Sequence, residues 1–180
     1  PHFPGVAPDS ASVTFLGTEP IDILRFRGAD GVVHYVSLGC SRHPMTDPAQ
    51  VVTDQLRGPR AEVVLSQRGA GPVRGLGRSL AVVAATPAVD GVVLTADALI
   101  DLGSPLWAGA PFTAVLLGSS DIADLPLESP RDPVQFLSAI PITPTEAAWV
   151  RLKGAEAMRQ AWEDDGVDVL DPNRPAARPG

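Results

Sequence analysis

The chain has 180 residues, of which 44% are hydrophobic and 19% charged, so it is long and apolar enough for one domain with its own core. A formal net charge of −7 disfavours contact with phosphate backbones, and no apolar run is long enough to span a bilayer. We therefore expect neither a nucleic-acid nor a membrane partner. The arginines nearest to a basic cluster are spaced by Gly and Pro: Arg57, Arg60, Arg68, Arg74 and Arg78.

Cys40 is the single cysteine, which excludes an internal disulfide and favours a reducing compartment. We therefore expect a cytoplasmic protein. The first residue is Pro1 in place of Met, so we expect the natural chain to start upstream.

The first elements predict a hairpin. Residues 1–12 read as an irregular entry because Pro and Gly interrupt them, and Val13–Leu16 is a short apolar run. Ile21–Phe26 alternates as a strand does, and Val32–Leu38 is rich in Val and Tyr. The turn residues 28–31 join these two strands.

The middle of the chain alternates loops with short elements. We expect a loop over Gly39–Pro48, a short helix over Ala49–Gln55 and a strand over Ala61–Gln67. Helical spacing of apolar residues begins at Leu76, and Pro87 is expected to end that helix. Further on we expect strands over Val92–Leu94, Phe112–Leu117 and Val134–Ile142, with an ordered loop over Ala98–Trp107.

The clearest signal is a helix near the C-terminus. Thr143 and Glu146 form a capping box with Pro144 at the first helical position. An apolar stripe follows as far as Trp162, and Gly166 suits the helix end, so we expect one helix that packs on the sheet through Trp149 and Leu152. The Pro-rich tail, Asp171–Gly180, is expected to bury nothing.

The order of strands, helix, strands, helix indicates an α+β fold. We expect a mixed, largely antiparallel sheet flanked by helices, because the βαβ rhythm of a parallel sheet is missing. The expected organisation is an irregular entry at 1–12, one domain at 13–170 and a tail at 171–180.

Cys40 lies between His34 and His43, which raises two chemical hypotheses. One is a thiol nucleophile with a histidine base, and a serine hydrolase centred on Ser119 is its counterpart. The other is a zinc site, but zinc prefers four ligands in two close pairs. We favour a half-buried thiol with ordinary histidines, and expect no catalytic residue, metal or cofactor.

Two other patterns fail as sites. The stretch Gly69–Gly77 lacks the Gly-Lys-Ser/Thr ending of a phosphate loop and has Arg74 where a dinucleotide loop needs its third glycine. Asp121, Asp124 and Glu128 are spread along a loop and indicate a solvated edge. Trp107 lies in a loop, where it either plugs the loop onto the sheet or stands at a contact surface; we favour the plug.

Three ordered segments carry a family resemblance. They are Val33–Ser41 running into Pro44-Met45, Ala61–Ser66 led by Glu62, and Phe136–Ile142 before Thr145-Glu146, with Gly154 and Asp171–Arg174 behind them. In this order they resemble the suppressor-of-fused family, from about Val13 to Arg174. Cys40 stands where Met is common in that family, and the chain has no room for the second lobe of the animal member.

The resemblance implies an α/β/α-type sandwich around a mixed sheet, and a role in binding proteins. Stand-alone bacterial members resemble parts of toxin–immunity systems, so the resemblance also implies an immunity protein that blocks a toxin. The net charge of −7 suits a toxin with a basic surface. The resemblance assigns no individual binding residue, and our own candidates are Tyr35, Arg42, His43 and Trp107. A thiol or serine hydrolase centred on Cys40 or Ser119 is the alternative.

Overall fold

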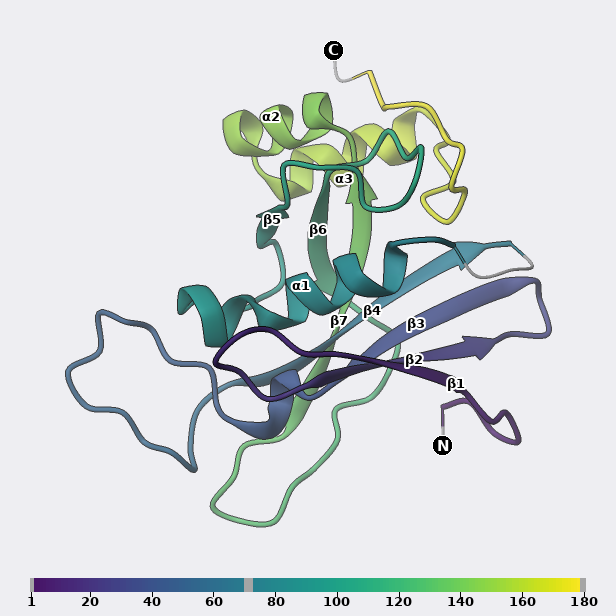
Figure 1. Ribbon diagram of the computed structural model, residues 1–180. Helices are drawn as coiled ribbons and strands as arrows, with labels where there is room; N and C mark the ends of the chain where they lie inside the picture. The colour runs from purple at the N-terminus through teal and green to yellow at the C-terminus, as the bar shows by residue number, and fades with distance from the viewer. Residues whose placement is uncertain (1, 70–72, 179–180) are drawn as a thin grey trace.

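The computed structural model describes residues 2–69 and 73–178. One mixed sheet runs through this part of the chain in the order β1-β2-β3-β4-β7-β6-β5 (Figure 1). Neighbouring strands are antiparallel except for β4 and β7, so the expected α+β fold with a largely antiparallel sheet is confirmed. The strands are β1 (Asp9–Val13), β2 (Ile21–Arg27), β3 (Val32–Leu38), β4 (Arg60–Arg68), β5 (Leu99–Asp101), β6 (Ala114–Ser119) and β7 (Val134–Ile142).

The helix α1 (Leu76–Asp90) covers one face of the sheet, which we call the inner face (Figure 1). Every second residue of the strands points to this face, and Ile23, Tyr35 and Leu65 pack there against Leu76 and Leu80 of α1. Burial of this apolar stripe is what holds a helix on a sheet.

The helices α2 (Pro144–Lys153) and α3 (Ala155–Asp164) cover the opposite, outer face at the β5–β6 end. Leu116 of β6 and Ile142 of β7 pack there against Ala147, Met158 and Trp162. None of the helices in the described ranges covers the outer face over β2, β3 and β4. None of them is long and apolar enough to cross a bilayer either.

Some expected elements are wrong, for local reasons. Ala49–Gln55 forms turns in place of a helix, since Asp47 and Asp54 accept backbone N–H bonds from residues that follow them. Val92–Leu94 is not a strand, whereas Leu99–Asp101, inside an expected loop, is β5. The entry is regular from Asp9 onward because β1 pairs with β2.

Two helix ends also differ from expectation. Pro87 lies inside α1, which continues to Asp90. The C-terminal helix is divided at Gly154, whose φ of +91° suits glycine alone. Leu152 is 75% exposed and does not pack on the sheet, so that expectation is wrong, while Trp149 is half-buried.

The expectation that the tail buries nothing is wrong. Arg174 and Ala177 are each 3% exposed and belong to the packing around α2 and α3. Arg174 donates to the carboxylate of Glu146, which is itself fully buried. The tail therefore closes the outer layer of the fold.

Candidate functional site

The structure separates the four candidate binding residues. Tyr35 and Trp107 are core side chains, 5% and 8% exposed. Arg42 and His43 lie on the surface, at the end of the short 3-10 helix η1 (Cys40–Arg42). Arg42 donates to the carbonyl of Pro20, and His43 Nε2 lies 3.1 Å from the Glu19 carboxylate.

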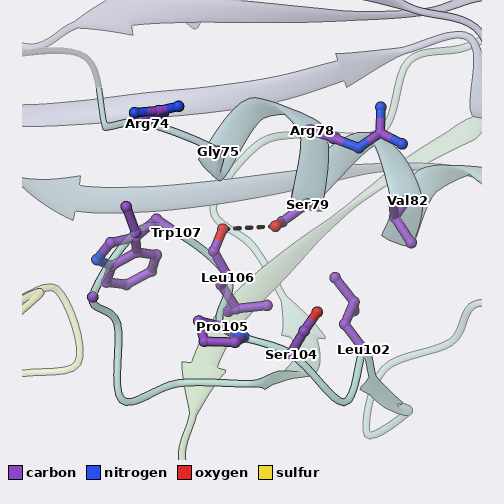
Figure 2. Close-up of a pocket in the computed structure, with 12 residues that line it drawn as sticks. Arg74, Gly75, Arg78, Ser79, Val82, Leu102, Ser104, Pro105, Leu106 and Trp107 are labelled. Atoms are coloured by element: carbon purple, nitrogen blue, oxygen red, sulfur yellow. Dashed lines mark hydrogen bonds between the residues drawn. The ribbon is translucent and has the colours of Figure 1, made fainter.

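Trp107 plugs a loop onto the core beside a hollow of about 470 Å³ (Figure 2). The Ser79 hydroxyl of α1 donates to the Leu106 carbonyl at 2.6 Å, and this bond ties the loop to the helix. The rim carries two exposed arginines, Arg74 and Arg78. A basic rim favours an acidic ligand rather than a basic partner.

The glycine-rich stretch Gly69–Gly77 leads into this hollow. Its residues 70–72 lie outside the part of the chain that the structure describes. Gly75 forms the N-cap of α1 with φ of +90°, a backbone conformation that glycine adopts without strain.

Cys40 and His43 line one cavity of about 430 Å³, whereas His34 lies in another. Burial, followed by the negative charge of Glu62, raises the pKa of the Cys40 thiol to about 12. A nucleophile needs the thiolate, which is scarce at such a pKa, so the burial of Cys40 disfavours it as a nucleophile. Across residues 2–69 and 73–178, no group of three His, Cys, Asp or Glu residues is placed to hold a metal ion.

Glu62 is a buried acid whose structural role the sequence analysis did not predict. Its carboxylate accepts bonds from the backbone N–H groups of Gly39 and Ser41, both at 2.9 Å, and from the Ser41 hydroxyl at 2.7 Å. The Ser37 hydroxyl donates to it as well. The sequence did contain a signal for this role, because Glu62 is the one acid in the apolar stretch Ala61–Leu65. A carboxylate that is buried in a strand requires hydrogen-bond partners. Glu62 fixes the chain where β3 turns into η1.

The outer face carries an apolar groove beside Glu62, with a cavity of about 270 Å³. Two of its side chains are unusually exposed for leucine, Leu38 at 48% and Leu125 at 51%. Contiguous exposed apolar surface is typical of interaction sites. We name this surface the outer-face groove; its main lining residues are Leu24, Phe26, Val36, Leu38, Leu125 and Phe136.

The connection between β6 and β7, residues 120–133, forms one wall of the groove. Leu125 and Val134 exchange two backbone bonds of 2.9 Å, which pin the loop to the sheet. The loop is acidic, with one arginine, Arg131, against four exposed carboxylates: Asp121, Asp124, Glu128 and Asp132. The groove therefore combines an apolar floor with an acidic loop beside it, whose Asp121 lines the neighbouring cavity of about 250 Å³.

Ser119 lies farther along the same face, in a cavity of about 250 Å³ that His34 also lines. His34 Nδ1 lies 2.7 Å from Ser66 Oγ, because these two residues are direct partners in the β3–β4 register. Burial lowers the pKa of His34. A serine and a histidine opposite each other on antiparallel strands form an ordinary cross-strand pair, which by itself indicates no catalysis.

Comparisons with known proteins agree on one family. Residues 17–175 match the family model described as suppressor of fused protein (SUFU). A suppressor-of-fused homolog from Neisseria gonorrhoeae shares 19% identity with a TM-score of 0.64, covering 95% of this chain and 88% of its own. None of the curated proteins matches the sequence.

Two further solved structures have the same fold. A chain of the Sufu–Fu complex has 15% identity and a TM-score of 0.61, with 94% of this chain and 84% of its own covered. Drosophila Suppressor of Fused gives the same identity and TM-score and covers 94% of this chain. This chain spans 47% of that Drosophila structure.

Proposed function

The chain belongs to the suppressor-of-fused family, and from that membership we propose that it is a non-catalytic domain that binds one protein partner. The observation that carries the proposal is the outer-face groove. It presents exposed leucine and half-buried phenylalanine side chains on a part of the sheet that none of the helices in the described ranges covers. Such surfaces stabilise complexes by burying apolar area.

The charge of the chain supports a basic partner. Its formal net charge is −7, and the wall of the groove at residues 120–133 is acidic. Complementary charge accelerates encounter and selects against acidic competitors. We therefore propose an immunity protein that blocks a basic toxin in the cytoplasm. One relative has been solved as a Sufu–Fu complex, which supports a protein as the partner.

Arg42 and His43 are proposed to border the contact area. Both side chains are exposed and their neighbour Ser41 lines the outer-face groove, whereas His43 itself lines the cavity of about 430 Å³ against α1, on the inner side of the sheet. Tyr35 and Trp107 are proposed to contribute only by supporting the fold, since both belong to the core under α1 and their burial leaves little area for direct contact.

The test begins with the purified chain as bait in a lysate of its source cell, followed by titration calorimetry with the purified captured protein. We expect a saturable one-to-one complex whose association rate falls as salt rises, because acidic surface steers a basic partner. Catalytic turnover of a small substrate that Ser119→Ala or Cys40→Ser abolishes would support the hydrolase alternative instead.

A further inference from the structure

The outer-face groove already holds an aromatic side chain from this chain. The ring of Phe3 stacks on Phe26 with centroids 4.5 Å apart and ring planes 19° apart. The same ring lies 5.0 Å from the imidazole of His34. Stacked aromatic rings attract each other beyond the effect of the area they bury. The groove is therefore an aromatic slot, and Phe3 shows what fits it.

Phe3 divides one longer groove into two cavities. The cavity beside Leu125 and the cavity beside Ser119 are both lined by His2, Phe3 and Ile122. Without the Phe3 ring the two would join along the sheet face. Cavities of about 250 and 270 Å³ in a row on a sheet face offer room for an extended peptide segment rather than for a single side chain.

The segment that carries Phe3 is weakly attached to the sheet. Pairing of β1 with β2 begins at Asp9, and in the described part of the chain no backbone hydrogen bond holds residues 2–8 to the sheet. Pro4, Val6 and Pro8 are exposed. The side chains of His2 and Phe3 therefore provide the main attachment of this segment.

His2 faces the acidic wall while Phe3 enters the slot. The Nε2 atom of His2 lies 3.9 Å from an Asp121 carboxylate oxygen, and the Asp121 side chain is 91% exposed. The segment thus presents an imidazole to the Asp121 carboxylate and an aromatic ring to the apolar floor. This pairing matches the charge and the chemistry of the groove on both counts.

We propose that the outer-face groove binds an extended segment of the partner in which a basic residue precedes an aromatic residue, and that His2 and Phe3 occupy this place until the partner displaces them. The inference rests on the proposed function and adds the chemistry of the partner. The protein's own segment competes at high effective concentration, because a short tether keeps it near the slot.

The test uses a synthetic peptide with the sequence of residues 1–8 as the probe. It is titrated into the wild type, into Phe3→Ala and into the matched control Val6→Ala, with binding followed by NMR shifts of residues on β2 and β3. We expect Phe3→Ala to bind the peptide roughly tenfold more tightly than the other two proteins. Peptides in which alanine replaces phenylalanine, or glutamate replaces histidine, are expected to lose most of this affinity.

Two results would overturn the inference. One is equal affinity of the peptide for all three proteins, and the other is no binding to Phe3→Ala when its melting temperature shows it to be folded. Should Phe3→Ala unfold, the more conservative Phe3→Leu supplies the second arm and is expected to bind the peptide more tightly than the wild type, because it removes the aromatic stacking on Phe26. A captured partner that binds wild type and Phe3→Ala equally, while groove substitutions weaken it, would refute the displacement and leave the proposed function standing.

Discussion

Arg174 grips the carboxylate of Glu146 with two bonds of 3.0 Å, one to each oxygen, across 28 residues of sequence. Trp162 Nε1 donates to the same carboxylate at 2.8 Å, and the Thr143 backbone N–H at 3.0 Å. The guanidinium also lies 4.9 Å from the Phe112 ring, which belongs to the core under α1. One buried ion pair therefore joins the capping box, α3, the tail and the inner core.

Replacement of Arg174 is expected to destabilise the fold strongly. Arg174→Met leaves Glu146 buried without its counter-charge, which costs about 3–5 kcal/mol of the free energy of unfolding. Urea melts at neutral pH measure the loss, with the exposed Arg178→Met as the matched control. A loss no greater than that of the control would mean that the tail is not part of the folded domain.

The same pair predicts a pH dependence. Burial alone raises the pKa of Glu146, but the bonds from Arg174, Thr143 and Trp162 outweigh it and hold the pKa below the ordinary 4.5. Because the folded-state pKa is lowered, this stabilisation is complete above about pH 4.5 and is lost as the pH falls through the lowered value. Urea melts between pH 7 and pH 3 should show a shallower decline for Glu146→Gln than for the wild type. Equal slopes would contradict the assignment.

Trp162 rather than Leu152 should carry the packing of the C-terminal helices. Trp162 is 4% exposed within the outer core, so Trp162→Ala should cost about 3–5 kcal/mol of the free energy of unfolding. Leu152 is 75% exposed, so Leu152→Ala should change it by less than about 0.5 kcal/mol. Chemical melts of both variants measure the free energy of unfolding, and a similar loss in the two variants would contradict the structure of α2.

Local signals in the sequence predict what local physics determines. The hairpin of β2 and β3 and the capping box at Thr143 depend on neighbouring residues, and both are present. The break at Gly154 and the burial of Arg174 depend on contacts between distant segments, which periodicity does not encode. Leu152 belongs to the apolar stripe by its spacing and was therefore expected to pack on the sheet. The helix ends two residues later, at Gly154, and Leu152 faces solvent.

The candidate site shows the same division. Trp107 was expected to plug its loop, and the structure places it against Phe112 with ring centroids 5.5 Å apart. The outer-face groove was not expected, because Leu24, Phe26 and Phe136 each read as ordinary strand residues. Only the sheet order, which brings β7 beside β4, gathers them on one face.

Cys40 should react slowly with thiol reagents in the folded protein. With its pKa raised to about 12 from 9.0, the thiolate at pH 8 is roughly a thousandfold scarcer than for an unperturbed thiol. Labelling with a chromogenic disulfide at pH 8 measures the rate, and addition of urea should restore ordinary reactivity. Fast labelling of the native protein would revive the thiol-hydrolase alternative.

The most direct test of the binding account compares two exposed leucines. Leu125 lies in the outer-face groove and Leu152 on α2, at 51% and 75% exposure, so an aspartate at either position should be tolerated by the fold. The measurement is the dissociation constant of the captured partner for Leu125→Asp and Leu152→Asp. We expect Leu125→Asp to weaken binding at least about tenfold and Leu152→Asp to leave it unchanged. Unchanged affinity for Leu125→Asp would show that the partner binds elsewhere and would contradict the account.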